Sequence, residues 1–480
     1  MKNKNTNNSR RSFIKTTAII GTGISIVPRH VLGQGFIAPS DKLNIAIIGA
    51  GGKGYSDAIN VWNNGANNIT AICDVDWIRA AETFNKFPNA KKYKDYRKLF
   101  DEIKDFDAVT ISTPDHTHAV ISMAAMKLGK HVYVQKPLTH NIYEARVLTE
   151  AANTYKIVTQ MGNQGASGEG VKKMMEWFDD GKIGTVNKVD VWTNRPIWPQ
   201  GIPMQIDTPE KPDGLDWDSW IGPAEMMPYH QQFHPFKWRG WWNFGTGALG
   251  DMGCHLIDPP YRVLGLGYPT SVECSVGAVF LKDWTPEYLP ESCPPSSRTQ
   301  LTFKATKKNN TNLKLTWTDG GLRPFHPDLI PADHPLGMHN SSNGVLMYGE
   351  KGIMSCGVYG RTPKIYFNNG DVLEFNDSAE AELPENGHHT AWVNACKAGY
   401  KSKEHKKLTS SFDFAGPLTE SILMGNLAIR SYDIRIENTN KRFDYPGRKK
   451  LLWDGKNMKI TNFEEANEFV RRTYREGWSL

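Results

Sequence analysis

Lys136, Asp251 and His255 have side chains of the types that polarise an alcohol and take up its hydroxyl proton while the carbon loses a hydride to another acceptor. Lys136 ends a short apolar run, whereas Asp251 and His255 are four residues apart in a predicted helix and therefore share one helix face. Histidine titrates near neutral pH and lysine polarises an oxygen atom, which suits the oxidation of a secondary hydroxyl. The alternative for the helical pair is structural, with Asp251 capping the helix and His255 buried with satisfied hydrogen bonds.

A glycine-rich turn indicates a second kind of chemistry, the binding of a dinucleotide. Gly49, Gly51 and Gly54 follow an apolar run and open a predicted helix. In this pattern the first glycine permits a tight turn, the second lets the backbone approach a pyrophosphate, and the third lets helix and strand pack closely. Asp74 follows Gly54 by twenty residues, where a carboxylate can accept hydrogen bonds from both ribose hydroxyls. It would repel a 2'-phosphate, so NAD is favoured over NADP, although Arg79 keeps NADP open.

The elements that must position these residues alternate between short apolar strands and helices. The predicted strands are Leu43 to Ile48, Ile69 to Cys73, Ala108 to Ser112, His131 to Val134 and Ile157 to Thr159. The alternation predicts an α/β fold that begins with a doubly wound Rossmann domain at residues 41–162. Thr113, Pro114 and His118 follow one strand and Lys136 another, at the carboxyl edge where such sheets bind ligands, so we expect these four residues to contact the cofactor.

Beyond residue 162, longer strands follow one another with few helices between them. The predicted strands are Lys188 to Thr193, Ser271 to Phe280, Thr299 to Lys304, Leu313 to Thr318 and Gly344 to Tyr348, and the predicted helices are Thr390 to Ala398 and Leu418 to Tyr432. We therefore expect residues 163–480 to form a substrate-binding α+β domain with a large, mainly antiparallel open sheet and a C-terminal segment that can pack back on the first domain. The stretch Arg195 to Tyr229, rich in Trp and Pro, is expected to be an ordered loop near a ligand, or else an interface loop.

The chain resembles the Gfo/Idh/MocA family of oxidoreductases, named after glucose-fructose oxidoreductase and inositol 2-dehydrogenase. The motifs that carry the resemblance come in the family's order: the glycine turn, Thr113-Pro114-Asp115-His116-Thr117-His118, and Gln135-Lys136-Pro137. The family's usual Glu-Lys-Pro is Gln-Lys-Pro here, so any role of that carboxylate does not carry over. The resemblance implies that Lys136, Asp251 and His255 surround the substrate carbon. His255 would then be the acid/base, Lys136 the polarising or relay cation, and Asp251 the orienting partner or substrate hydrogen-bond acceptor.

Five further residues are expected near the cofactor or the substrate. Arg239 lies among tryptophans, and its guanidinium can hydrogen-bond to oxygen atoms beside the cofactor. Asn163 and Arg195 are expected on the substrate side, together with Trp198 and Trp242, because aromatic faces stack on sugar rings. The alternative for this region is core tryptophan with a surface arginine.

Metal and disulfide chemistry find little support in the sequence. The six cysteines are scattered without a Cys-x-x-Cys pair, and most are expected to be buried thiols. His326, His334 and His339 lack the close spacing of metal ligands. No metal site is predicted.

The basic residues in excess all lie in the first 40 residues, which contain no acidic residue, so the net charge of +6 leaves the rest of the chain neutral. A neutral body argues against nucleic acid or an anionic membrane as partner. Ser9-Arg10-Arg11-Ser12-Phe13-Ile14-Lys15 and the apolar stretch after it resemble a twin-arginine export signal at residues 1–40, a disordered basic terminus being the alternative. That stretch is far shorter than the roughly 20 residues of a spanning helix, so no permanent membrane span is expected.

These features predict an exported, periplasmic oxidoreductase that acts on a secondary hydroxyl of a sugar, polyol or glycoside with tightly bound, internally recycled NAD. A redox-neutral NAD-dependent glycosidase, which acts through a transient ketosugar and elimination, is the alternative. A cofactor-bound protein without turnover is a third hypothesis. The expected partners are a carbohydrate, the twin-arginine export machinery and, by analogy with the family, further copies of the chain.

Overall fold

The computed structural model describes residues 41–480, except residues 339–340, 376–384 and 441. The predicted export signal at residues 1–40 and His339 lie outside the described residues. Among the helices in the described ranges, none combines the length and the apolar character needed to cross a membrane. All six cysteines are free thiols, and five of them are buried.

A parallel sheet of six strands, in the order β3-β2-β1-β4-β5-β6, occupies the first part of the chain. Its strands are β1 (Asn44–Ile48), β2 (Asn68–Cys73), β3 (Lys91–Tyr93), β4 (Ala108–Ile111), β5 (His131–Val134) and β6 (Thr159–Met161). The helices that follow them are α3 (Lys53–Trp62), α4 (Ala81–Lys86), α5 (Tyr96–Glu102), α6 (Asp115–Lys127) and α7 (Ile142–Thr154). The strand order reverses between β1 and β4, which is the switch point where doubly wound sheets bind ligands. The predicted Rossmann fold is confirmed.

A second sheet of ten strands has the order β14-β13-β12-β11-β7-β10-β9-β8-β17-β18, and every pair except β7 with β10 is antiparallel. Its strands are β7 (Val186–Thr193), β8 (Ser271–Val276), β9 (Ser297–Phe303), β10 (Leu313–Thr318), β11 (Asn343–Gly349), β12 (Gly352–Cys356), β13 (Lys364–Phe367), β14 (Val372–Glu374), β17 (Leu451–Asp454) and β18 (Lys459–Ile460). A separate hairpin pairs β15 (Ile436–Glu437) with β16 (Phe443–Asp444). The expected large, mainly antiparallel sheet is therefore confirmed.

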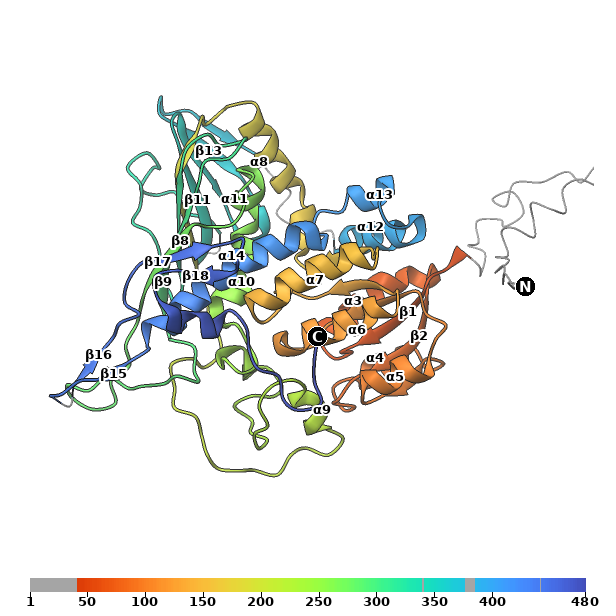
Figure 1. Ribbon diagram of the computed structural model, residues 1–480. Coiled ribbons are helices and arrows are strands. Elements are labelled where there is room, and N and C mark those ends of the chain that lie inside the picture. The colour runs from red at the N-terminus through yellow and green to blue at the C-terminus, as the bar shows by residue number, and fades with distance from the viewer. Residues whose placement is uncertain (1–40, 339–340, 376–384, 441) are drawn as a thin grey trace, which may run out of the picture. The chain divides into compact units, whose positions relative to one another are not determined.

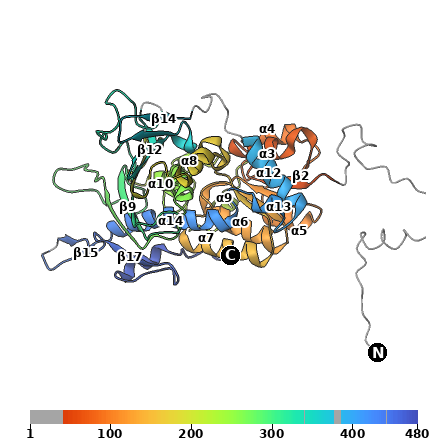
Figure 2. The same cartoon turned by 90° about the horizontal axis from the view of Figure 1, so that it is seen from above.

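The remaining helices follow the first sheet along the chain. They are α8 (Glu169–Asp179), α9 (Trp217–Ile221), α10 (Gly247–Leu256), α11 (Asp258–Val263), α12 (Glu385–Ala398), α13 (Lys403–Lys406) and α14 (Phe412–Tyr432). Figures 1 and 2 show α14 and α10 between the two sheets, with α14 beside α7 and α12 beside α3. Arg146 of α7 and Glu420 of α14 form a largely buried ion pair of 2.8 Å between these two helices. The C-terminal segment thus packs on the helices of the first sheet, and residues 43–480 form one compact unit.

The loop between β7 and α10 is held by an aromatic cluster. Trp217 and Trp220 of α9 stack with ring centroids 4.5 Å apart, and Phe233, Trp241 and Phe244 pack in the same buried cluster. Burial of such rings stabilises a segment that has little regular structure. The loop is therefore ordered, as the sequence predicts, and its inner side faces the end of β2, where Asp216 N–H donates to Val75 O at 2.8 Å.

Candidate active site

The glycine turn joins β1 to α3 through backbone geometry that side chains would obstruct. Gly49 has φ = 79°, in the left-handed region that favours glycine. A Cβ at Gly54 would lie 2.0 Å from the carbonyl oxygen of Gly49, so only glycine lets α3 start this close to the strand. A Cβ at Gly51 would lie 3.1 Å from the backbone oxygen of Arg79, so the next loop also approaches the turn.

Asp74, at the end of β2, braces this turn. Its Oδ2 accepts hydrogen bonds from Ala50 N–H at 2.6 Å and Gly51 N–H at 3.1 Å, and its Oδ1 accepts from Asp76 N–H at 2.8 Å. Burial raises the pKa of Asp74, although these backbone hydrogen bonds oppose the change. A carboxylate offers about four acceptor sites, so three bonds leave one for a ribose hydroxyl and not the two expected from sequence.

A cavity of about 430 Å³ extends from the glycine turn along the carboxyl ends of β1, β2, β4 and β5. Gly49, Gly51, Gly52 and Lys53 line it at the start of α3, a helix that no side chain of the described residues caps. An uncapped helix N-terminus presents backbone N–H groups and the positive end of the helix dipole to an anion. The residues present therefore fit the pyrophosphate of a dinucleotide.

Lys136 lines the other end of the cavity and forms an ion pair with Asp251, which lies outside the cavity lining. The Lys136 ammonium donates to Asp251 Oδ1 and to the Asp251 carbonyl oxygen, both at 2.8 Å, and Arg239 Nε lies 3.5 Å from the same Oδ1. Burial alone would raise the pKa of Asp251, but the charges of Lys136 and Arg239 and the hydrogen bond from Lys136 lower it to about 2. Lys136 and Arg239 line the cavity with Thr113 and Pro114.

His255 lies one helical turn beyond Asp251 on α10, behind the cavity lining. Its ring packs edge-on against Tyr359 with centroids 4.6 Å apart, and it is 6% exposed. Burial, with the nearby charge of Lys136, holds the pKa of His255 well below its ordinary value, so the imidazole is neutral. Its Nδ1 is buried and has no hydrogen-bond partner among the described residues.

Asp115 is a second buried carboxyl in the cavity, and the sequence predictions gave it no role. Its Oδ2 accepts a hydrogen bond of 2.7 Å from the Thr246 hydroxyl. Burial raises its pKa to about 7, the bond from Thr246 and the charge of Arg239 oppose this, and the charge of Asp251 adds to it. A carboxyl that titrates near neutral pH beside Lys136 and Arg239 can hold or release a proton at the site. Its place in the motif after β4 was the only available sequence signal.

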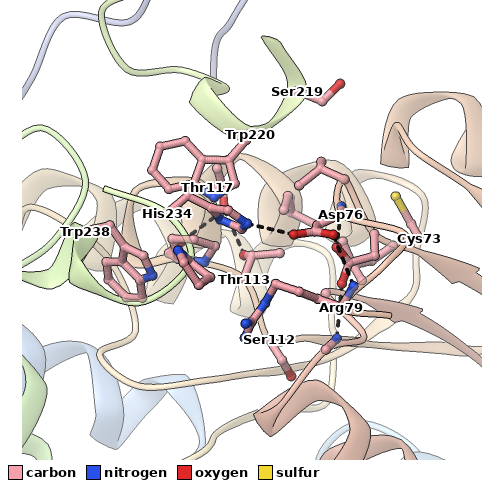
Figure 3. A pocket seen from close by; sticks show the side chains of 18 of the residues that line it. Cys73, Asp76, Arg79, Ser112, Thr113, Thr117, Ser219, Trp220, His234 and Trp238 are labelled. Atoms are coloured by element: carbon pink, nitrogen blue, oxygen red, sulfur yellow. Dashed lines mark hydrogen bonds and ion pairs between the residues drawn. The ribbon is translucent and has the colours of Figure 1, made fainter. Parts of the chain in front are cut away.

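The aromatic loop contributes further cavity residues that the sequence did not identify. Figure 3 shows His234 facing Asp76, with Trp220 beside the His234 ring. The His234 Nε2 and the Asp76 carboxylate are 2.8 Å apart and buried. This contact fastens the loop to the end of β2 across the cavity, so Trp220 and Trp238 form an aromatic wall opposite the glycine turn. The expected position of the loop near a ligand site agrees with this arrangement.

His118 does not line the cavity, contrary to the predicted cofactor contact. Its ring nitrogens lie 2.8 Å from the carbonyl oxygens of Pro137 and Thr113, and the side chain is 1% exposed. The ring therefore ties together the two loops that follow β4 and β5. Burial lowers the pKa of His118 to about 4, although the two carbonyl contacts favour the protonated ring and oppose this change.

Three of the residues expected on the substrate side lie elsewhere. Trp242 lines a different cavity and contributes nothing to this one. Arg195 donates to its neighbour Asn194 at 2.9 Å, outside the cavity lining. Trp198 is buried outside the cavity lining, and its ring packs against two residues of the lining, Arg239 and Phe236, each at 5.9 Å from its ring centroid. These three residues lie away from the site because of the path of the loop, which cannot be predicted from a local sequence pattern.

Asn163, the remaining substrate-side prediction, is 1% exposed just after β6. Neither its Oδ1 nor its Nδ2 has a hydrogen-bond partner in the described part of the chain. The next segment touches the Tyr359 ring that packs on His255, since a Cβ at Gly165 would lie 2.7 Å from Tyr359 Cβ. Unsatisfied polar atoms in a buried position are typical of a site that holds a ligand or water.

Gln135, where the resembling family has Glu, takes part in a buried network. Its Nε2 donates to Asp57 Oδ2 at 2.8 Å, and the Ser112 hydroxyl donates to the same oxygen at 2.7 Å. His389 of α12 lies 3.0 Å from the other carboxylate oxygen of Asp57. Burial would raise the pKa of Asp57, but His389, Lys53 and Ser112 lower it to about 2. Asp57 therefore already places a charged carboxylate next to the side chain of residue 135.

Comparisons with protein families agree with both halves of the fold. Residues 43–163 match the model described as an oxidoreductase family with an NAD-binding Rossmann fold. Residues 172–280 match the model of the C-terminal alpha/beta domain of the same oxidoreductase family. The first part of the chain is thus an NAD-binding Rossmann domain.

Individual proteins show the same likeness at low identity. The chain is 26% identical over 255 residues to levoglucosan dehydrogenase of Pseudarthrobacter phenanthrenivorans, covering 51% of this chain and 55% of that protein. It is 29% identical over 180 residues to an alpha-N-acetylgalactosaminidase of Shewanella oneidensis, and the match covers 32% of this chain and 39% of that protein. A solved inositol dehydrogenase homolog from Azotobacter vinelandii, complexed with NADH and myo-inositol, has the same fold with a TM-score of 0.54 at 15% identity, covering 80% and 94%. The chain thus spans about half the length of levoglucosan dehydrogenase, and less of the galactosaminidase.

Proposed function

The chain belongs to the Gfo/Idh/MocA oxidoreductase family, and on that premise we propose that it oxidises a secondary hydroxyl of a sugar, polyol or glycoside with bound NAD. One observation carries the proposal: Lys136 lines the cavity that begins at the glycine turn, and Asp251 outside the lining holds its ammonium through two oxygens 2.8 Å away. A fixed cation at the carboxyl edge of this sheet is where a substrate oxygen would be polarised beside a dinucleotide.

The residues that would hold NAD are Gly49, Gly51 and Gly52 of the turn and Asp74 beside it. When bound, NAD supplies the acceptor for the hydride of the alcohol carbon. An ammonium group has three donors, and Asp251 takes two of those on Lys136, so one N–H remains for the substrate oxygen. That hydrogen bond stabilises the developing alkoxide, while the ionised Asp251 keeps the ammonium in place.

The proton of the substrate hydroxyl needs an acceptor, and we assign this role to His255. The imidazole is neutral before the reaction and so has a lone pair for the proton; because His255 lies behind the cavity lining and its Nδ1 is buried, substrate binding must open a path to that nitrogen. Asn163, predicted on the substrate side, lies outside the cavity lining and is almost fully buried, so it has no direct part in this proposal. Trp220 and Trp238 suit an uncharged carbohydrate, because the faces of sugar rings pack on aromatic rings.

We further propose that the enzyme is exported and carries its own cofactor. Nicotinamide nucleotides are not freely supplied outside the cytoplasm, and the twin-arginine route carries folded proteins, so the cofactor would travel inside the protein. NAD would then be reduced by one sugar and reoxidised by another, or by the product of the first step. The test is mass spectrometry of small molecules released by denaturing desalted protein. Stoichiometric NAD or NADH is expected, and an empty protein with millimolar affinity for NAD would refute retention.

A second candidate, a redox-neutral glycosidase, is favoured by the match to an alpha-N-acetylgalactosaminidase. Transient oxidation of a sugar carbon acidifies the neighbouring C–H, which permits elimination of the aglycone before the hydride returns. Lys136 and His255 would serve both reactions. Aglycone release from a glycoside without net change in NADH absorbance would identify the glycosidase, whereas accumulation of a ketosugar would identify the dehydrogenase.

The proposed role of Lys136 is tested by Lys136→Met, with Lys127→Met on the exposed end of α6 as the matched control. We expect Lys136→Met to lower kcat by about 10²- to 10⁴-fold on whichever substrate the screen identifies, because the polarising donor is lost. The control should keep full activity. Equal activity of the two variants would refute the assignment.

A further inference from the structure

A second cavity, of about 600 Å³, lies where the start of α7, the end of α14 and the C-terminal segment meet. It shares no lining residue with the cavity at the glycine turn. A recess of about 20 Å³ continues from it toward Asn426 and has Asn141, Trp242 and Arg430 in common with it. The recess extends the cavity inward from the protein surface toward buried residues of α14.

Asn141 offers an unsatisfied donor to this cavity. The residue is 7% exposed, and its Oδ1 accepts the N–H of Glu144 at 3.0 Å as the N-cap of α7. The cap determines which end of the amide is which, so the atom without a partner among the described residues, Nδ2, is a donor. The N-terminus of a 13-residue helix adds the positive end of its dipole.

Two guanidinium groups line the cavity and have N–H donors without a hydrogen-bond partner among the described residues. Arg472 uses Nε and Nη2 on Glu144 and the His116 carbonyl oxygen, and its buried Nη1 has no partner within the described ranges. Arg430 packs over Phe469, 4.2 Å from the ring centroid, and the structure gives it no hydrogen bond or ion pair in the part of the chain it describes. Burial lowers the pKa of Arg430 to about 10, against the opposing effect of Glu468, as expected for a desolvated cation short of a close anion.

The other titratable groups of the lining do not supply that anion. Glu468 is exposed, and the Asp433 carboxyl forms no ion pair with Arg430 or Arg472 among the described residues. Arg471 is a third cation and packs on Tyr143, 4.3 Å from the ring centroid. Burial and the charges of Arg472 and Arg430 hold the pKa of His140 far below its ordinary value, so it is neutral.

We propose that this cavity is a binding site for a small oxyanion, such as phosphate or the carboxylate of an acidic sugar, with Asn141, Arg430 and Arg472 as its donors. Asn141 Nδ2 and Arg472 Nη1 are buried donors without a partner among the described residues, and Asn426 Oδ1 in the recess is an acceptor without one. Guanidinium groups bind the oxygens of phosphate and carboxylate in pairs. Arg472 also holds the carbonyl of His116, in the motif that lines the first cavity, so a bound oxyanion would stabilise the loop beside Asp115.

The test is isothermal titration of the full-length protein with inorganic phosphate, glucuronate and, as the neutral probe, glucose. We expect saturable binding of at least one of the two anions and none of glucose at this site. Phosphate alone would identify a phosphate-type ligand, and glucuronate alone an acidic sugar. Absence of binding by both anions would overturn the proposal.

Two variants and a control place the binding in this cavity. Asn141→Asp keeps an N-cap acceptor but replaces the donor by a carboxylate oxygen, and Arg430→Gln removes a cation. Each should weaken anion binding by about 10-fold or more, since charge-assisted hydrogen bonds are lost. Arg298→Gln, which removes one exposed arginine of β9, should bind as the wild type does. Equal weakening in all three variants would show a nonspecific counterion effect and overturn the site.

A measurement on the wild-type protein covers the case in which a variant fails to fold. Phenylglyoxal modifies accessible guanidinium groups, and mass spectrometry locates the adducts. Saturating phosphate or glucuronate should protect Arg430 and leave Arg298 reactive. Equal modification of Arg430 with and without the anion would contradict the proposal.

Discussion

Replacing Asp115 by Asn should make the protein more stable at neutral and alkaline pH. The wild-type carboxyl has a pKa of about 7 when folded and an ordinary value of 3.8, chiefly because it is buried. Asn keeps the side-chain volume and an oxygen that can accept the 2.7 Å hydrogen bond from Thr246, but it carries no charge. The substitution therefore isolates the free energy of ionising one buried carboxyl.

The sign follows from which state holds the proton. Below pH 3.8 the carboxyl is protonated in both the folded and the unfolded chain, so it has no effect. Between 3.8 and about 7 the unfolded chain releases the proton and the folded chain retains it, so stability falls as pH rises. Above pH 7 both states are ionised, and the loss levels off at about 4 kcal/mol.

The assay is urea unfolding of wild type and Asp115→Asn at pH 5, 6, 7 and 8, followed by tryptophan fluorescence. The free energy of unfolding of the variant relative to the wild type should rise by about 2.5 kcal/mol from pH 5 to pH 8. Asp101→Asn, which removes an exposed carboxylate of α5, should show no such rise. Parallel pH curves for wild type and Asp115→Asn would refute the reasoning that burial keeps this carboxyl protonated.

Two further substitutions test the turn and the motif that departs from the family. Gly54→Ala places a Cβ 2.0 Å from Gly49 O, so the turn must shift and the amount of co-purified nucleotide, measured by mass spectrometry, should fall at least 10-fold. Gly267→Ala, whose Cβ has nothing within 4 Å, is the control. Full retention of nucleotide by both variants would contradict this role of Gly54. Gln135→Glu replaces the donor 2.8 Å from Asp57 by a second buried carboxylate, so the protein should lose about 2 to 4 kcal/mol. The fall in Tm should be larger at pH 8 than at pH 5, and an unchanged Tm at both would refute the network.

Local patterns predicted five of the six strands of the first sheet and the order of its motifs, but they missed β3 (Lys91–Tyr93) and placed the last strand about two residues too early. β1 was predicted to within one residue, because a β-branched apolar run followed by a glycine turn satisfies strand, turn and helix from its own residues. The strands β7, β9, β10 and β11 were also anticipated from their apolar runs. The sequence did not reveal β12, β13 and β14, since short strands depend on pairing with neighbours for their stability.

The site divides in the same way between sequence and tertiary structure. Residue types and the family resemblance pointed to Lys136 and Asp251, although 115 residues separate them; Lys136 follows β5 at the ligand edge, whereas Asp251 lies within α10. The proton affinity of Asp115, the burial of His255 and the place of Trp242 in another cavity came only from the fold. Solvent exclusion and the charges of groups distant in sequence set those properties, and neither is present in a local run of residues.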